Sequence, residues 1–470
     1  MGRKNRRVKT FEKVEVVDTG NKGKSVAKTE EGQVIFVDHA VPGDVVDVTT
    51  YKKRKSFFQA RVDHFHTYSE RRTEPKCIHF GTCGGCKWQN MKYEDQLYFK
   101  EKEVIQNLQR IGKLELPEKH RILGSEKQYL YRNKMEFSFS NQRWLTKEEI
   151  DHKDEIENKT ALGFHIPGMW DKILNLKECH LQAEPSNSIR IAVKTFADEH
   201  QMEFFDPKAQ TGFLRTLMIR TSSTGEIMVL IQFFKEKEPH RKLLLDFIKE
   251  KFPEVTSLQY VINSKANDTI YDQEVVCYHG KDHIMEEMEG LYFKINAKSF
   301  YQTNSEQAYE LYKITRDYAQ LSGEELVYDL YTGTGTIAQF VAKNAKKVVG
   351  IEAVPEAIED AKENAKRNQI ENTEFFAGDM KKIFTEDFIS THGKPDVIIT
   401  DPPRDGMHKD VVAQILSILP ERIVYVSCNS ATQARDLELM KSHYKVEKVQ
   451  AVDMFPQTHH VENVVSLILK

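Results

Sequence analysis

The sequence predicts a multidomain chain with a small N-terminal OB-like β-barrel, a mixed α+β central domain and a C-terminal Rossmann-like α/β domain. Three observations indicate this order: short β-like runs separated by turns near the N-terminus, three cysteines crowded together after them, and alternating strands and helices after residue 326. A length of 470 residues suits two to four domains. We expect the three domains to span 1–66, 67–290 and 291–470.

The N-terminal segment combines short β-like runs with positive charge. Turns at Gly20–Gly23, Glu31–Gly32 and Pro42–Gly43 separate these runs, which predicts five short strands in a barrel of the oligonucleotide-binding type. Residues 1–76 carry 17 Lys and Arg against 11 Asp and Glu, so their net charge is +6 and that of the remainder is −9. Basic and aromatic residues interleave in Tyr51–Phe58. This segment is the expected contact for a polyanion.

The same segment resembles the TRAM domain. The resemblance rests on Gly32–Val37, Val41–Asp44 and Phe58–Val62, and it implies that the barrel binds RNA. A second interpretation of the lysines is that they protect an exposed strand edge from pairing with another chain.

A helix is predicted at about 93–112, because Leu97, Val104, Ile105 and Leu108 fall on one face. We expect it to act as a brace that packs on the C-terminal domain. The region after the helix is rich in strand-like segments. Some of its basic residues are candidates for phosphate contacts, although exposed strand arginines usually meet only water or a neighbouring carboxylate: Arg132, Lys134, Arg215 and Arg220.

The C-terminal region begins with a turn of the nucleotide-binding type. Leu326–Thr336 is an apolar strand that runs into a two-glycine turn, and Ile337–Ala345 is predicted to be a helix. A second strand, Lys347–Glu352, ends on a carboxylate about 20 residues after the turn, a spacing that suits hydrogen bonds to ribose hydroxyls. A third strand, Thr373–Asp379, also ends on an acid. Ligands of open α/β sheets bind where such strand ends meet.

Cys428 is a candidate nucleophile at the same edge of this sheet. It follows the apolar strand Arg422–Val426 and comes about 25 residues after Thr400–Arg404, which has the sequence Thr-Asp-Pro-Pro-Arg. A cysteine at a strand end is more often a small buried hydrophobe. The acids and glycines at the neighbouring strand ends favour the catalytic interpretation.

These motifs together resemble the S-adenosylmethionine-dependent RNA 5-methyluridine methyltransferase family. Asp453–Asn463 looks like the closing motif of the family, and Lys298–Asn304 looks like its Phe-Phe-Gln-x-Asn motif with Tyr301 in place of a phenylalanine. Ser430 departs from a common proline, and Thr332, Thr334 and Thr336 stand where Cys and Asn are frequent. The resemblance implies that the donor is bound by Gln302, Tyr331, Gly333, Gly335, Thr336, Glu352, Asp379 and Asp401.

The resemblance also implies a covalent mechanism. Carbon 5 of uracil is a poor nucleophile until a thiolate adds to carbon 6, and Cys428 would be that thiolate. Glu462 would be the general base that removes the proton from carbon 5. Asp401 is expected against the uracil edge or the methyl donor, with Arg404 holding the loop or a phosphate.

Four of the six cysteines suggest a metal site. Cys77, Cys83 and Cys86 lie within ten residues, a spacing that suits a soft metal or an iron-sulfur cluster. Cys179 is the best candidate for the fourth ligand, and the resemblance implies a [4Fe-4S] cluster. A four-thiolate zinc site is the alternative, and disulfides are not expected. Cys277 is predicted to be a buried strand residue.

The expected partner is RNA. Members of the family with both the barrel and the four cysteines mostly modify 23S ribosomal RNA, and the same reaction on transfer RNA is the nearest alternative. Cytosine methylation, amino-group methylation and a non-enzymatic iron-sulfur RNA-binding protein fit the motifs less well. With no run of about 18 apolar residues, we expect a soluble cytoplasmic protein without a membrane span or an obligate protein partner.

Overall fold

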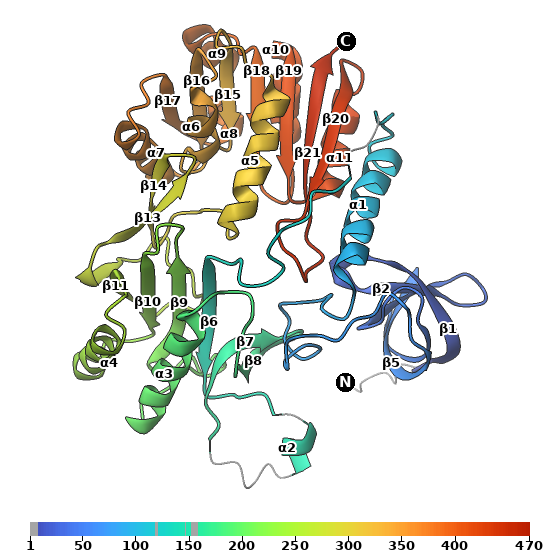
Figure 1. Ribbon diagram of the computed structural model, residues 1–470, viewed down its shortest axis with the longest axis vertical. Coiled ribbons are helices and arrows are strands. Elements are labelled where there is room, and N and C mark those ends of the chain that lie inside the picture. The colour runs from blue at the N-terminus through green and yellow to red at the C-terminus, as the bar shows by residue number, and fades with distance from the viewer. Residues whose placement is uncertain (1–7, 118–120, 146, 152–157) are drawn as a thin grey trace.

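The structure is a computed structural model that describes residues 8–117, 121–145, 147–151 and 158–470. Within these residues the strands form a closed five-stranded barrel, two seven-stranded sheets and a separate two-stranded hairpin. Figure 1 shows the barrel beside the two large sheets, with helix α1 (Tyr93–Arg110) between the barrel and the C-terminal sheet. The predicted multidomain architecture is confirmed, whereas the domain boundaries at 66 and 290 stay a prediction.

The N-terminal barrel forms because its strands alternate inward apolar and outward polar side chains. In the fourth strand Val46 and Val48 are fully buried, whereas Asp47 and Thr49, which alternate with them, are partly exposed. The strand order is β1-β2-β3-β5-β4, with β3 and β5 parallel. The elements are β1 (Thr10–Thr19), the short 3-10 helix Asn21–Gly23, β2 (Ser25–Lys28), β3 (Val34–Asp38), β4 (Val45–Lys53) and β5 (Phe57–Thr67).

The central sheet has the order β12-β11-β10-β9-β6-β7-β8 and is antiparallel except for the β10–β11 pair. Its β9 and β10 are buried almost throughout because helices cover them. Its strands are β6 (Lys134–Ser140), β7 (Ala161–Ile166), β8 (Met169–Asn175), β9 (Leu214–Thr221), β10 (Ile227–Phe233), β11 (Ser257–Ile262) and β12 (Val276–Gly280). The helices are α2 (Lys147–Asp151), α3 (Ser186–Glu199) and α4 (Glu238–Lys251), and the hairpin β13 (His283–Met288) and β14 (Leu291–Asn296) follows.

Three side chains of this region differ from expectation. Arg215 and Arg220 are buried and donate to backbone carbonyls, for example that of Asn263 at 2.8 Å and that of Ser299 at 2.7 Å. Their guanidinium groups hold loops together and do not face a phosphate. Cys277 lies in a strand as predicted but is exposed, because β12 is the edge strand of the sheet.

The C-terminal sheet has the order β17-β16-β15-β18-β19-β21-β20, in which β15 to β19 are parallel and β21 is antiparallel to its neighbours. Strands such as β18 are apolar and buried throughout because helices cover both faces. The strands are β15 (Leu326–Leu330), β16 (Lys347–Glu352), β17 (Thr373–Ala377), β18 (Val397–Thr400), β19 (Arg422–Ser427), β20 (Tyr444–Val452) and β21 (Glu462–Leu469). The helices are α5 (Ser305–Ala319), α6 (Thr336–Ala342), α7 (Pro355–Arg367), α8 (Met380–Ile383), α9 (Glu386–His392), α10 (Lys409–Ile418) and α11 (Ser430–Met440).

Helix α1 packs against α11 of the C-terminal sheet. The side-chain amide of Asn107 donates a hydrogen bond to Ser430 Oγ at 2.8 Å. Ser430, the departure from a common proline, therefore fastens α11 to α1. On the barrel side, Lys102 forms an ion pair with Asp18 at 2.7 Å, so α1 connects the two parts.

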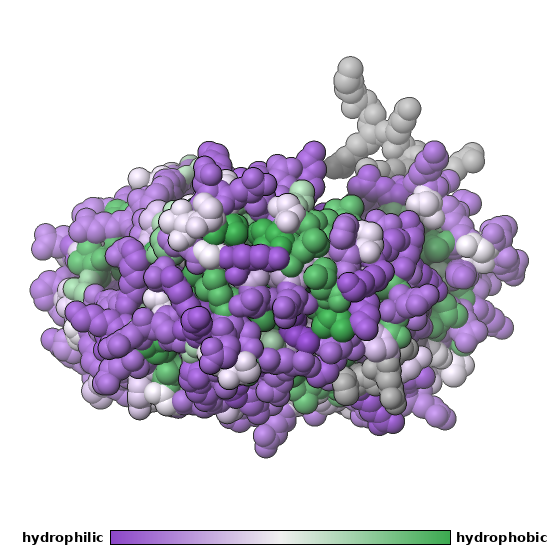
Figure 2. Space-filling model, turned by 90° about the horizontal axis from the view of Figure 1, so that it is seen from above, coloured by the Kyte–Doolittle hydropathy of each residue, from purple (hydrophilic) through white to green (hydrophobic). Residues whose placement is uncertain are grey.

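The outer surface is mostly hydrophilic. Seen from above, charged and polar side chains cover most of it, and apolar ones show in patches along the middle (Figure 2). The mean hydropathy of −0.56 agrees with this view. Among the described residues, no helix is both long and apolar enough to cross a membrane.

Candidate active site

The structure brings Cys428, Glu462 and Asp401 together at one edge of the C-terminal sheet. The antiparallel register of β19 and β21 sets Ser427 opposite Asn463, so Cys428 and Glu462, one position further on, lie beside each other. Asp401 follows β18, which pairs with β19 on its other side. The three predicted catalytic residues therefore come from adjacent strand ends, where open α/β sheets place their chemistry.

These three groups are electrostatically coupled. Burial raises the pKa of the Cys428 thiol to about 11, and the carboxylates of Glu462 and Asp401 add to the shift. Burial, followed by repulsion from Asp401, raises the pKa of Glu462 well above its usual range. Burial raises the pKa of Asp401 to about 7. The arrangement provides a thiol and a carboxylate with a high proton affinity side by side.

Arg404 is the cation that opposes these shifts at both Cys428 and Glu462. Its backbone carbonyl accepts hydrogen bonds from the Asn429 side-chain amide at 2.9 Å and from Thr432 Oγ1 at 3.0 Å. Asn429 also caps α11 by accepting from the Ala431 amide. The residue after the candidate nucleophile thus fixes the Asp-Pro-Pro-Arg loop next to it.

The glycine turn after β15 has the backbone conformation of a nucleotide-binding turn. Gly335 has a φ of 75°, and a Cβ at this position would lie 2.9 Å from the Ala361 Cβ. Only glycine fits there without displacing the packing of α7. The Gly333 amide donates to the Glu352 carboxylate at 3.2 Å, so the end of β16 and the turn form one site.

Asp329 in β15 belongs to this site but was missed from the sequence. Its side chain is fully buried, its Oδ2 accepts from Thr332 Oγ1 at 2.5 Å, and its Oδ1 has no hydrogen-bond partner. Burial, with Asp401 and Glu352 nearby, raises its pKa to about 7. Asp329 could have been found from the sequence, because it is an acid inside the apolar run Leu326–Leu330. The nearby carboxyl groups of Asp329, Asp401 and Glu352 give this part of the site an acidic character that suits a cationic ligand.

The other residues predicted to bind the methyl donor differ from one another in burial and backbone conformation. Thr336 is buried at the start of α6, and Tyr331 has a φ of 64° in the turn. Asp379 is exposed and caps α8 by accepting from the Lys381 amide at 3.2 Å. The Gln302 carbonyl accepts from Asn133 at 2.8 Å. Their roles toward a donor stay predictions.

The aromatic residues of the Lys298–Asn304 motif and of α5 differ in their exposure. Of the two that the sequence left undecided, Tyr301 is buried and Phe300 is 67% exposed; only Phe300 is available to stack on a base. Tyr312 of α5 was not singled out, yet burial and the carboxylates of Asp401, Asp329 and Glu462 raise its pKa. Its helical position gave no sequence signal that its hydroxyl faces the acids.

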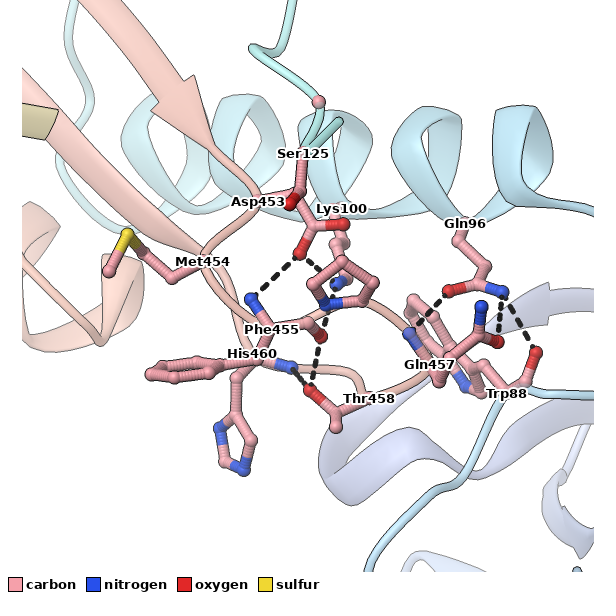
Figure 3. Close-up of polar contacts among 12 residues, drawn as sticks. Trp88, Gln96, Lys100, Ser125, Asp453, Met454, Phe455, Gln457, Thr458 and His460 are labelled. Carbon is pink, nitrogen blue, oxygen red and sulfur yellow. Dashed lines mark hydrogen bonds and ion pairs between the residues drawn. The ribbon is translucent and has the colours of Figure 1, made fainter. Parts of the chain in front are cut away.

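The segment between β20 and β21 is held by side chains of α1 (Figure 3). Lys100 Nζ contacts Asp453 Oδ1 at 2.6 Å and donates to the Phe455 carbonyl at 3.2 Å. Gln96 exchanges two hydrogen bonds with Gln457. Both Lys100 and Gln96 are fully buried, and neither was predicted as part of the site. This segment ends at Glu462.

The four predicted metal ligands lie close enough to influence one another's pKa. Burial raises the pKa of Cys83 to about 11 and that of Cys86 to about 12, and the other cysteines add to both shifts. Burial also raises the pKa of Cys77 and that of Cys179. Within the described ranges, no group of three or more His, Cys, Asp or Glu side chains is placed to hold a metal ion. The predicted cluster is not confirmed.

A groove of about 1040 Å³ lies along the central sheet, and Thr458 and His460 of the segment that ends at Glu462 line one side of it. It lies between the segment after Cys86, the β7–β8 turn and the segment that ends at Glu462. Trp170 at its border is 62% exposed. Lys87, Arg132 and Lys134 contribute basic side chains to its lining.

Comparison with known proteins agrees with this geometry. The family model described as tRNA (uracil-5-)-methyltransferase matches residues 210–470, and the TRAM domain model matches residues 6–62. An "uncharacterized RNA methyltransferase" of Bacteroides thetaiotaomicron is 58% identical over 95% of this chain and 99% of its own. Another from Porphyromonas gingivalis is 55% identical over 97% and 99%. A Pyrococcus abyssi tRNA (uracil-54, C5)-methyltransferase, solved with S-adenosyl-L-homocysteine, has a TM-score of 0.74 at 27% identity, covering 97% and 100% of the two chains.

Proposed function

This chain belongs to the tRNA (uracil-5-)-methyltransferase family, and we propose that it modifies one uridine of 23S ribosomal RNA. Members of the family methylate carbon 5 of uracil in RNA with S-adenosylmethionine. The observation that carries the proposed chemistry is the convergence of Cys428, Glu462 and Asp401 beside the glycine turn. A thiol, a base with high proton affinity and a donor pocket are the groups that carbon-5 methylation requires.

Cys428 activates the uracil ring. Its thiolate adds to carbon 6, the electron pair of the C5=C6 bond moves toward O4, and carbon 5 becomes nucleophilic. Because the pKa of Cys428 is raised to about 11 by burial and by two carboxylates, the thiolate needs help to form. The positive charge of Arg404 lowers the pKa of Cys428 and so favours the thiolate.

Glu462 completes the reaction. After carbon 5 has taken up the methyl group, Glu462 removes the proton that remains on carbon 5. The released electron pair restores the C5=C6 bond, and the Cys428 sulfur leaves as a thiolate. Burial raises the pKa of Glu462, and a base with a raised pKa accepts a proton more readily once it is ionised.

The residues of the turn fit the donor. When bound, S-adenosylmethionine supplies an electrophilic methyl group on a cationic sulfonium. Asp329 has a buried oxygen without a partner, and Asp401 lies near it. Gly333 has no atom within 4 Å of the position of a Cβ, so the turn leaves room for a ligand. Glu352, at the end of β16, is the proposed partner of the ribose hydroxyls.

The groove along the central sheet supports RNA as the substrate. Lys87, Arg132 and Lys134 contribute positive charge to its walls, and an exposed Trp170 offers a face on which a base can stack. A target uridine flipped out of folded RNA enters the site from this side. Phe300, which is exposed and lies two positions before Gln302, is a second candidate stacking surface.

The choice of 23S ribosomal RNA rests on the resemblance to family members that combine a TRAM barrel with four cysteines. The second candidate is transfer RNA, favoured by the similarity of the whole chain to the Pyrococcus abyssi enzyme, which acts on a tRNA. Both substrates leave the roles of Cys428 and Glu462 unchanged. A non-enzymatic RNA-binding protein would not need the acidic donor pocket.

The four thiols are part of the proposal as ligands of a [4Fe-4S] cluster, with zinc as the alternative. Three of them, Cys83, Cys86 and Cys179, pack against the core of the central sheet, which would shield a cluster from water. Protein purified without oxygen should contain iron and acid-labile sulfide in equal amounts. One zinc per chain without visible absorbance would favour the alternative.

Substitution of the two catalytic residues tests the mechanism. Cys428→Ala should abolish methyl transfer while donor binding persists, and Cys277→Ala, an exposed cysteine on β12, is the matched control. Glu462→Gln should accumulate a covalent protein–RNA adduct that survives denaturing electrophoresis, because addition precedes proton removal. Full activity of Cys428→Ala would refute the nucleophile assignment.

A further inference from the structure

The segment Asp453–His460, which leads into Glu462, has no regular secondary structure and depends on distant residues for its shape. Gln457 in this segment has a φ of 67°. A residue with a side chain rarely adopts this left-handed conformation, and it persists only where the surroundings enforce it. Gln457 is itself buried, at 3% exposed. Its neighbours therefore decide where the segment lies.

Two separate elements enforce this conformation. From α1, Gln96 Oε1 accepts the Gln457 amide at 2.9 Å, and Gln96 Nε2 donates to Gln457 Oε1 at 3.0 Å (Figure 3). From the segment directly after Cys86, the amides of Lys87 and Trp88 both donate to the Gln457 carbonyl, at 2.9 and 3.1 Å. All backbone groups of Gln457 are thus occupied by residues about 360 positions earlier in the chain.

Gln96 also fastens these two elements to each other. Its Nε2 donates to the carbonyls of Trp88 at 3.0 Å and Met91 at 2.9 Å. It lies on one helix face with Tyr93, whose hydroxyl donates to Asp453 at 2.9 Å, and with Lys100. The polar face of α1 therefore holds the whole Asp453–Gln457 stretch in one position.

We propose that Gln96 and the peptide amides of Lys87 and Trp88 are positioning groups for the general base, so that the cysteine segment acts on proton removal from carbon 5 and not only on folding. This inference rests on the proposed function. A displacement of about 1 Å at a reacting group lowers a rate by up to roughly a hundredfold. Loosening the segment should slow the step that uses Glu462 more than the steps that use Cys428.

The test separates these steps. Gln96→Leu keeps the size of the side chain but removes its hydrogen bonds to Gln457, and Gln109→Leu, at an exposed site of the same helix, is the control. With labelled S-adenosylmethionine and RNA, Gln96→Leu should lower kcat by roughly tenfold to a hundredfold, leave the KM for the donor unchanged and accumulate a methylated covalent adduct. The control should turn over without adduct.

A second pair of variants tests the cysteine segment itself. Lys87→Pro removes the amide that donates to Gln457, whereas Lys87→Ala keeps it. Both lose the same charge in the groove, but only Lys87→Pro should accumulate adduct. If Gln96→Leu does not fold, this pair still tests whether the contacts to Gln457 position the general base.

The outcomes distinguish this inference from the proposed function. Absence of 5-methyluridine with the unaltered protein would overturn the proposed function. If the unaltered protein is active but Gln96→Leu and Lys87→Pro lose activity without adduct, these groups only support the fold and the inference is wrong. Normal kcat in both variants would also overturn it.

Discussion

The buried ion pair between Lys100 and Asp453 should be the strongest single link between α1 and the segment that ends at Glu462. Its Nζ–Oδ1 distance is 2.6 Å, and both side chains are fully buried. Lys100→Met replaces the cation with an apolar side chain of similar length. Asp453 would keep the hydrogen bonds from the Tyr93 hydroxyl and the Phe455 amide but would lose the counter-charge of Lys100.

The expected loss is large. Removing one partner of a buried ion pair costs about 3–5 kcal/mol, because the other charge stays buried without compensation. The matched control is Lys102→Met on the same helix. Its partner, Asp18, is 2.7 Å away, but both side chains are 30% exposed, so that pair contributes about 0–1 kcal/mol.

Hydrogen exchange followed by mass spectrometry measures the stability lost in each variant segment by segment. This suits a multidomain chain that does not unfold in one step. A loss of about 3–5 kcal/mol in the free energy of opening should speed exchange in 453–457 and the facing part of α1 by roughly a hundredfold to a few thousandfold. The double variant Lys100→Met/Asp453→Leu should recover part of this loss. Equal exchange in Lys100→Met and Lys102→Met would refute the reasoning.

Three further predictions concern the site. The rate of adduct formation should rise up to tenfold per pH unit between pH 7 and 10, because the pKa of Cys428 is raised to about 11 and the thiolate is the attacking form; stopped-flow mixing with RNA measures it, and a flat profile would contradict it. Affinity for S-adenosylmethionine should rise as pH passes about 7, where Asp401 and Asp329 ionise, while neutral S-adenosylhomocysteine responds less; calorimetry at pH 6 and 8 compares them, and equal slopes would refute the anionic pocket. Trp170→Ala should raise the KM for RNA by roughly tenfold, as the loss of one base stack worth about 1–3 kcal/mol implies, and Tyr271→Ala, at another exposed site, should not.

The candidate site could be placed at one edge of the sheet from the sequence because its signals are local. Gly333 and Gly335 follow an apolar strand, and Cys428 and Glu462 flank other apolar strands, so each motif could be placed at a strand end without knowledge of the tertiary structure. The parallel sheet then brings these ends together. The structure confirms the barrel and the Rossmann-like sheet for the same reason.

The missed residues depend on contacts between distant parts of the chain. Gln96 and Lys100 lie on the buried face of α1, but a pattern of apolar residues assigns polar side chains to the opposite face. Their partners, Gln457 and Asp453, are more than 350 positions away. Arg220 was a phosphate candidate for a similar reason, since the carbonyls that it contacts lie at the end of β14 and just after it, more than 70 positions away.

Methyl transfer from labelled S-adenosylmethionine into undermodified 23S ribosomal RNA and transfer RNA, run side by side and followed by nucleoside analysis, tests both the reaction and the substrate. We predict 5-methyluridine at one position of 23S RNA with the unaltered protein and none with Cys428→Ala. Label in transfer RNA alone would keep the chemistry and replace the substrate. Label in another nucleoside, or in neither RNA, would contradict the assignment of the site.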